Sequence, residues 1–202
     1  MFVITADQRG SRTNADLIPP TLAAVVTAAG KGLRLEPERT AGDELQVAIG
    51  EARAALDVVL HLTRMQTWSV GIGIGSVEQP LPAQVRAARG AAFLHARDAV
   101  ERAKRSPTRV ALSDGGTTEG ADAEAFVRLL IELRDRRTPE GWEVHDLLVQ
   151  GGTQREAAAE LGITEGAVSL RARNAGLRAE EGAVPALERL LRRLDESDQP
   201  TV

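Results

Sequence analysis

An aspartate that follows an apolar segment is the first residue whose chemistry can be inferred from the sequence. Residues 1–6, MFVITA, form an apolar run that predicts a buried strand, and Asp7 comes directly after it. Gly10 then opens a loop. A carboxylate beside a glycine loop at the end of a buried strand can hold a cation or cradle phosphate. An aspartate that only caps a turn produces the same pattern, so Asp7 alone leaves both interpretations open.

A second group of polar residues lies in the segment 151–177, GGTQREAAAELGITEGAVSLRARNAGL. Thr153 and Glu156 have the spacing of a capping box, which predicts the start of a helix. Gly162 suits a tight turn that needs positive φ, and Thr164 is placed to cap a second helix. The segment therefore predicts two short helices joined by a glycine turn, which is the pattern of a helix-turn-helix.

The second of these helices carries side chains that can donate hydrogen bonds to base edges and phosphates. The residues predicted to contact duplex DNA are Thr153, Gln154, Thr164, Glu165, Ser169, Arg171, Arg173 and Asn174. The alternative is a helical corner that only packs a small domain. The segment has three arginines and three glutamates and is neutral, so DNA binding requires contacts focused on the second helix or a homodimer.

The elements that position these residues follow the order strand, helix, hairpin, helix, strand, helix, strand up to residue 112. Helices are expected at 17–30, 51–65 and 87–105, and strands at 1–6, on both sides of the turn 41–44, at 68–78 and at 108–112. This order predicts a ferredoxin-like core with a mainly antiparallel sheet. The first strand then lies beside the hairpin, which brings Asp7 and Asp43 to one end of the sheet. Two close carboxylates repel each other unless a cation or a proton lies between them.

The segment 71–75, GIGIG, places three glycines on one face of a predicted strand. The absence of side chains on that face lets another element approach the strand closely. A packed helix and a bound ligand are equally good explanations of this pattern.

Several short motifs, taken together, resemble the SatD family and the palm domain of class III nucleotidyl cyclases and GGDEF proteins. They are Ala6-Asp7, Gly10-Ser11, the turn 41–44, the glycines of 71–75, Gly90 and Ala96-Arg97. The resemblance implies that Asp7 and Asp43 bind divalent metal, Mg²⁺ together with a nucleotide. It also implies that Gly10 and Ser11 form a phosphate loop and that Arg97 contacts the nucleotide. Phe93 stands where cyclases have an asparagine, which argues against catalysis, and no catalytic residue is assigned.

The second predicted motif also has a family resemblance. The segment 151–177 is similar to the helix-turn-helix of sigma-factor region four and of LuxR-type and MarR-type regulators. This resemblance implies an all-α DNA-binding domain that follows the α+β palm-like domain. The expected division is a palm-like domain at 1–113, a linker at 114–123 that is rich in Gly, Thr and Asp, and a helical domain at 124–202.

Three further patterns occur in the helical part of the sequence. The expected helix at 124–137 has an apolar face made of Phe126, Leu129, Leu130 and Leu133, and it ends in the basic run Arg134, Arg136 and Arg137. The basic run either favours the helix C-terminus electrostatically or contacts phosphate. The leucine stripe at 187–194 either closes the small domain or forms a dimer seam.

Composition limits the remaining function classes. The 202 residues include no cysteine, so disulfide and thiolate chemistry are excluded, and the net charge of −4 gives no overall attraction for nucleic acid. No apolar run reaches membrane-spanning length, and a cytoplasmic protein is expected. The sequence thus predicts a DNA-binding transcriptional regulator, a homodimer whose palm-like domain dimerises or senses a nucleotide. The alternative is a nucleotidyl cyclase-like or other nucleotide-handling enzyme that uses Asp7 and Asp43 with divalent metal.

Overall fold

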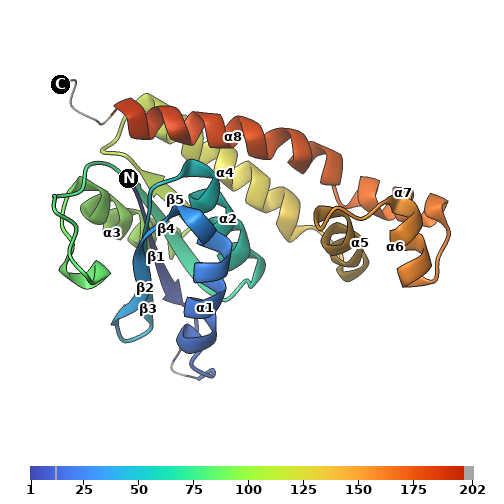
Figure 1. Ribbon diagram of the computed structural model, residues 1–202, viewed down its shortest axis with the longest axis horizontal. Helices are drawn as coiled ribbons and strands as arrows, with labels where there is room; N and C mark the ends of the chain where they lie inside the picture. The colour runs from blue at the N-terminus through green and yellow to red at the C-terminus, as the bar shows by residue number, and fades with distance from the viewer. Residues whose placement is uncertain (12, 198–202) are drawn as a thin grey trace. The chain divides into compact units, whose positions relative to one another are not determined.

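The chain alternates strands and helices up to residue 113 and is helical afterwards (Figure 1). The structure is a computed structural model that describes residues 1–11 and 13–197. None of its described helices has the length and the apolar composition that crossing a membrane requires. In chain order the elements are β1 (Phe2–Gln8), α1 (Ile18–Ala29), η1 (Gly30–Gly32), β2 (Leu33–Ala41), β3 (Glu44–Ile49), α2 (Ala52–Arg64), β4 (Trp68–Ile74), η2 (Val85–Ala87), α3 (Ala91–Ala103), β5 (Val110–Ser113), α4 (Thr118–Asp135), α5 (Pro139–Val149), α6 (Gln154–Leu161), α7 (Glu165–Asn174) and α8 (Leu177–Ser197).

The strands form one sheet in the order β2-β3-β1-β4-β5. The pairs β2–β3, β3–β1 and β1–β4 are antiparallel, and only β4–β5 is parallel. The predicted α+β class with a mainly antiparallel sheet is therefore confirmed. The first strand also lies beside the hairpin, as the predicted topology requires, and Gly42 turns the chain between β2 and β3 with a φ of 51°.

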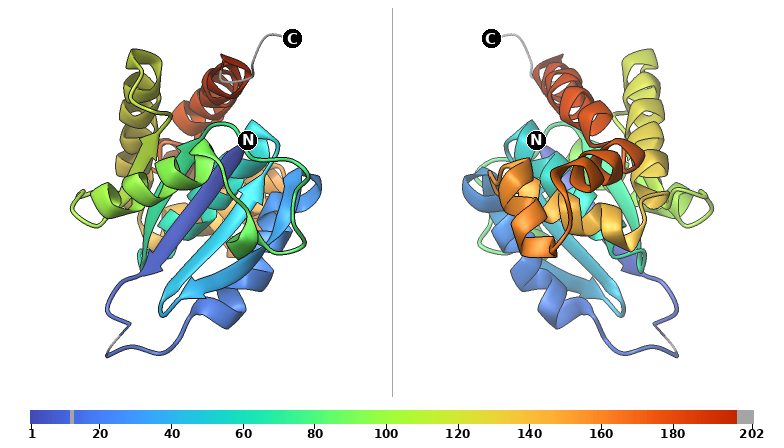
Figure 2. Two further views of the ribbon diagram at one scale, coloured as in Figure 1. Left: turned by 90° about the vertical axis from the view of Figure 1, so that its left-hand side faces the viewer. Right: turned by 90° about the vertical axis from the view of Figure 1, so that its right-hand side faces the viewer.

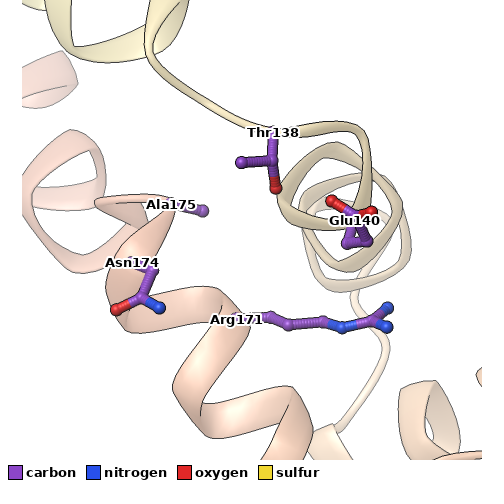
Figure 3. A pocket seen from close by; sticks show the side chains of 5 residues that line it. All are labelled: Thr138, Glu140, Arg171, Asn174 and Ala175. Atoms are coloured by element: carbon purple, nitrogen blue, oxygen red, sulfur yellow. The ribbon is translucent and has the colours of Figure 1, made fainter.

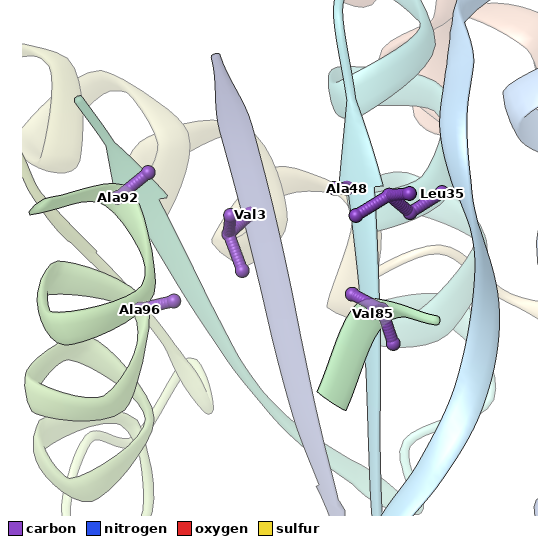
Figure 4. Packing of buried hydrophobic residues seen from close by; sticks show 6 residues of the cluster. All are labelled: Val3, Leu35, Ala48, Val85, Ala92 and Ala96. Carbon is purple, nitrogen blue, oxygen red and sulfur yellow. The ribbon is translucent and has the colours of Figure 1, made fainter. Parts of the chain in front are cut away.

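Helices cover both faces of this sheet. Figures 1 and 2 show α3 on one face and α1 with α2 on the other. Residues on both faces of β3 and β4 are therefore buried, because the second face packs under α3 and η2. Figure 4 shows this second layer, whose buried members are Val3, Leu35, Ala48, Val85, Ala92 and Ala96.

The glycines of β4 let α3 lie directly on the sheet. A Cβ atom added to Gly71 would lie 2.6 Å from the Ala96 carbonyl oxygen, and one added to Gly73 would lie 2.8 Å from the Ala96 Cα. Atoms of a folded protein do not approach each other this closely, so glycine is required at both positions. Of the two explanations that the sequence left open, the packed helix is the one found.

The chain forms two compact units, and their limits differ from the expected ones. The first unit contains Met1–Arg128 together with the segment that begins at Leu187, and the second contains Leu129–Ala186. In place of a linker over 114–123, α4 begins at Thr118. The leucine stripe at 187–194 belongs to the first unit, where Leu187, Leu191 and Leu194 are buried, so it neither closes the small domain nor offers a dimer seam.

Helix α4 buries a different face from the one expected. Phe126 and Leu129, both predicted to face inward, are 57% and 66% exposed. The apolar residues of α4 form two overlapping stripes that share Leu130, and helical periodicity alone does not decide between them. The structure buries the stripe of Ala123, Val127, Leu130 and Ile131 and continues it with the paired side chain of Arg134.

We expect Gly73→Ala to destabilise the protein by about 1–3 kcal/mol or more, because the new methyl group collides with the backbone of α3. Gly182→Ala is the matched control. Gly182 lies inside α8, and apart from its chain neighbours and the adjacent backbone of that helix no atom lies within 4 Å of the position that an added methyl group would take, so alanine there should stabilise the helix by about 0.5–1 kcal/mol. Urea unfolding followed by circular dichroism measures both effects. A harmless Gly73→Ala would contradict the close packing of α3.

Candidate functional site

The two helices of the predicted DNA-binding motif are both present and both capped. The Thr153 hydroxyl accepts a hydrogen bond from the Glu156 amide at 3.2 Å, and the Glu156 carboxylate accepts one from the Thr153 amide at 2.8 Å. This is the predicted capping box, and the hydrogen bonds from Thr153 lower the pKa of Glu156. At the second helix, the Thr164 hydroxyl accepts from the Ala167 amide at 3.2 Å. Both N-termini are therefore fixed by their own side chains.

The turn between α6 and α7 has the predicted form, and the two helices cross at small side chains. Gly162 ends α6 in the left-handed conformation, with φ 64° and ψ 32°. Ala157 and Ala158 of α6 pack with Val168 of α7 against Val144 of α5, and all four side chains are buried. Small residues on α6 let the helices come close, and Val168 fills the crossing. These contacts form the small apolar core that α5, α6 and α7 share.

The outer face of α7 is where a nucleic acid would have to bind. Arg173 and Asn174 are exposed, Ser169 is half-buried, and Leu170 is 53% exposed in the middle of the helix. The other predicted contact residues, Thr153, Gln154, Thr164 and Glu165, are exposed at the starts of α6 and α7. Leu170 is an apolar surface residue whose exposure becomes evident only when the buried face of α7 is known.

Arg171 points away from this outer face. It lies toward α5 (Figure 3). There its Nη1 atom is 3.2 Å from a carboxylate oxygen of Glu143. The side chain borders a pocket of about 250 Å³ that is lined by Thr138, Glu140, Arg171, Asn174 and Ala175. Two glutamates near one arginine leave it little net positive charge for a phosphate or a base.

A buried ion cluster fixes the far end of α7. The carboxylate of Glu180, in α8, accepts hydrogen bonds from Arg134 of α4 and from Arg137, which follows α4. Arg137 also donates from Nε to the carbonyl oxygen of Ala175, the residue that caps α7, at 3.0 Å. The ring of Trp142 lies 4.3 Å from the Arg137 guanidinium carbon. The cluster therefore links three helices and the C-terminus of α7.

The electrostatics of Glu180 follow from this cluster. Burial alone raises the pKa of a carboxyl group, but a hydrogen bond with His145 and the charges of Arg134 and Arg137 outweigh it and lower the pKa of Glu180 to about 2. Because Arg134 and Arg137 are buried, neither can contact phosphate, which was one of the two roles expected for the basic run. Only Arg136 of that run is exposed.

The second candidate site lies in the other unit, at the end of the sheet where β1 meets the hairpin. Asp7 lies opposite Glu44 in the antiparallel register of β1 and β3. The Gln8 amide donates to the Asp43 carbonyl oxygen at 2.9 Å. The Ser11 hydroxyl donates to the Asp43 carboxylate. The structure thus brings Asp7, Asp43 and Ser11 together, with Gly10 in the connecting loop.

Lys104, which the sequence analysis did not select, lies directly at Asp7. Its Nζ atom is 3.1 Å from a carboxylate oxygen of Asp7 and 2.7 Å from one of Glu101. Partial burial raises the pKa of Asp7, and the charge of Asp43 adds to this effect while Lys104 opposes it. Lys104 follows the end of α3, so only the packing of that helix against the sheet could reveal its position.

The remaining predicted ligand residue is not part of this group. Arg97 is exposed on α3, two helical turns before Lys104. Within the described ranges, no three His, Cys, Asp or Glu side chains gather in a way that could hold a metal ion. A divalent cation at Asp7 and Asp43 would therefore need water or phosphate oxygens as further ligands, which Mg²⁺ accepts readily. It would also have to displace the ammonium group of Lys104 from Asp7.

Comparison with known proteins gives one structural similarity. No protein-family model matches the chain, and no curated protein matches its sequence. Among solved structures, the chain is similar to the crystal structure of a regulator of polyketide synthase expression from Bifidobacterium adolescentis, with 15% sequence identity and a TM-score of 0.27 over 97% of this chain and 80% of that chain. A similarity of this degree supports no inference about the activity of the present protein.

We expect Glu180→Gln to lower stability by about 3 kcal/mol at neutral pH, because it leaves two buried guanidinium groups without their counter-charge. The pKa of Glu180 is depressed in the folded state, so its contribution is complete above the ordinary value of 4.5 and is lost as the pH falls toward 2. The variant should therefore show a weaker pH dependence of stability in this range.

Urea unfolding at several pH values measures both effects. Glu181→Gln is the matched control, because Glu181 is exposed on the same helix and its loss should change stability little. If the two variants have the same stability, or if the pH dependence of Glu180→Gln equals that of the unmodified protein, the cluster does not carry the stability assigned to it.

Proposed function

We propose that this protein is a transcriptional regulator that binds duplex DNA through α6 and α7. The observation that carries the proposal is the pair of capped helices, joined at Gly162 and crossing over Ala158 and Val168, with the opposite face of α7 open to solvent. A short helix that is held rigidly from behind and exposed in front has the form needed to enter a major groove.

The exposed residues of α6 and α7 would make two kinds of contact with DNA, some to base edges and others to phosphates. Arg173 is exposed and can reach a base edge, where arginine pairs with guanine in bidentate fashion. Asn174 is exposed at the edge of the pocket beside Arg171 and can pair with adenine in the same way. Thr153, Gln154, Thr164 and Glu165 lie at helix N-termini, whose backbone amides suit phosphate contacts that set the register. Arg171 has a positioning role instead, since Glu143 holds it against α5.

Affinity in this proposal comes from two copies of the chain. The segment 151–177 is electrically neutral, and a single copy would neutralise few phosphates at physiological salt. A homodimer doubles these contacts and reads a two-fold symmetric site. The first unit, with its five-stranded sheet, then serves as the dimerising or sensing part of the regulator.

We expect Arg173→Ala to weaken binding to the preferred duplex by about 1–3 kcal/mol and to relax specificity at one base pair. Arg105→Ala is the matched control, because it removes the same charge from an exposed position outside α6 and α7. A binding site is first selected from random duplexes with the full-length protein. Fluorescence anisotropy at several salt concentrations then compares the variants on that site.

The full chain is the right material for this experiment, since α4 and α8 contribute residues to both compact units and a truncation would cut their cores. Two results would refute DNA binding through α7. One is the absence of duplex binding at low salt, and the other is equal binding by Arg173→Ala and Arg105→Ala.

A second candidate function rests on the sheet end of the first unit. The observation that favours it is the convergence of Asp7, Asp43, Ser11 and Lys104 at one place. In this proposal the two carboxylates hold Mg²⁺, and Ser11, the Gly10 loop and Lys104 contact the phosphates of a nucleotide. Bound metal would neutralise the carboxylates and polarise a phosphate oxygen. Phe93 packs against the buried layer under α3 and is part of the core. Because it stands where cyclases have an asparagine, nucleotide sensing is a simpler role for this site than catalysis.

Differential scanning fluorimetry tests this site. A ligand that binds only the folded state raises the melting temperature, so Mg²⁺ with ATP or GTP should do so in the unmodified protein and not in Asp43→Asn. Lys104→Ala should melt at a lower temperature without Mg²⁺, because Asp7 loses its counter-charge, and should gain more from Mg²⁺ alone.

Lys31→Ala provides the control for the loss of a lysine, since Lys31 is exposed at a distance along the chain from this site. If neither Mg²⁺, Mn²⁺ nor nucleotides change the melting temperature, and Asp43→Asn stabilises the protein, then the carboxylates and Lys104 form a purely structural group. Turnover of ATP or GTP that Asp43→Ala abolishes would instead establish the enzyme alternative.

A further inference from the structure

Helix α4 exposes two large apolar side chains next to each other on one face. Phe126 and Leu129 are three positions apart in sequence, so they lie side by side on the helix surface, and both are more than half exposed. Single exposed apolar residues are common on protein surfaces, but adjacent phenylalanine and leucine side chains form a patch that favours contact with another surface.

Charged residues lie on the same face at both ends of the patch. Glu119 and Asp122 are exposed in the first turns of α4, and Arg136 is exposed just after its last residue. With 3.6 residues per turn, these residues and the apolar pair fall within about 100° of the helix circumference over a length of about 25 Å. The face is therefore acidic at its start, apolar in the middle and basic at its end.

We propose that this face of α4 binds the same face of a second copy of the chain in antiparallel orientation. A two-fold axis midway between Phe126 and Leu129 places Phe126 on Leu129 of the second copy and Leu129 on its Phe126. The same axis brings Glu119 opposite Arg136 of the second copy, because the two residues are equally far from the midpoint. An isologous interface needs this kind of self-complementary surface.

The charge order selects a second copy in this orientation over other arrangements. Parallel packing of two α4 helices would set Glu119 against Glu119 and Arg136 against Arg136, which is unfavourable. Arg136 now pairs with Glu132 on its own helix at 2.8 Å, and both side chains are largely exposed. Such a surface pair contributes little to stability, so Arg136 can exchange it for a glutamate of the second copy at small cost.

A contact confined to one helix from each copy gives a dimer of limited strength. Stable complexes generally bury about 1,200–2,000 Å² in total, more than a single pair of helices of this length provides. We therefore expect monomer and dimer to exchange as the protein concentration changes. The proposed DNA-binding function requires a second copy of the chain, and this interface would provide it. The interface itself is argued from the surface of α4 and can be tested without DNA.

Sedimentation equilibrium over a wide range of concentrations tests the proposed interface on the full-length protein. The unmodified chain should pass from monomer to dimer, and Phe126→Glu or Leu129→Glu should raise the dissociation constant at least about tenfold. The matched control is Leu94→Glu, which places the same charge at an equally exposed leucine on α3 and should leave self-association unchanged.

The charged ends provide an independent test of the antiparallel register. Glu119→Arg and Arg136→Glu should each weaken the dimer, and both changes in one chain should restore it, because the exchanged charges meet again across the two-fold axis. Circular dichroism confirms that each variant is folded. A protein that stays monomeric at every concentration, or self-association that Phe126→Glu, Leu129→Glu and Leu94→Glu affect equally, would overturn the proposal. Failure of the double variant to restore the dimer would overturn it as well.

Discussion

The buried carboxylate of Glu180 is the interaction on which the second unit depends. Three cationic or polar side chains converge on it, and one of them, Arg137, also holds the carbonyl that ends α7. Removing these charges from water is costly, and the cost is offset only when every member keeps its partner. The orientation of α7, and with it the outer face that carries Arg173, is therefore set by a polar cluster as well as by the small apolar core around Val168.

A second constraint, in the other unit, is the close contact between α3 and the sheet. Gly71 and Gly73 remove the side chains that would keep the helix away. The helix then runs far enough across the sheet for Lys104 to reach Asp7. The candidate nucleotide site is thus a consequence of packing. The close packing of α3 on the sheet buries Ala96 and also brings the ammonium group of Lys104 to Asp7.

The two candidate sites differ in the charges that a ligand would meet. The segment 151–177 is neutral, so in the proposed DNA-binding role its affinity would have to come from two copies of the site, which makes the exposed surface of α4 relevant to it. The sheet end already contains its own counter-charge, so a metal ion or a nucleotide has to compete with Lys104 rather than enter a site of unpaired carboxylates. Regulation by a ligand at the first site would require that competition to be coupled to the second.

Local patterns in the sequence determined much of this protein. The hairpin at Gly42, the capping box at Thr153 and the left-handed Gly162 all follow from neighbouring residues, because turns and caps depend on contacts a few residues apart. The approach of Asp7 to Asp43 followed from topology alone. These features fixed the α+β class and placed both candidate sites.

Only the tertiary structure decided which side chains are buried together. Helical periodicity allowed Phe126 and Leu129 to face inward, and the packing of α4 turned them outward. The basic run after α4 looked like a surface feature, but Arg134 and Arg137 are buried because Glu180, more than forty residues later, neutralises them. Tertiary packing likewise brings Lys104 to Asp7 and leaves Leu170 exposed on α7. A side chain's environment depends on residues distant in sequence, and no local pattern contains that information.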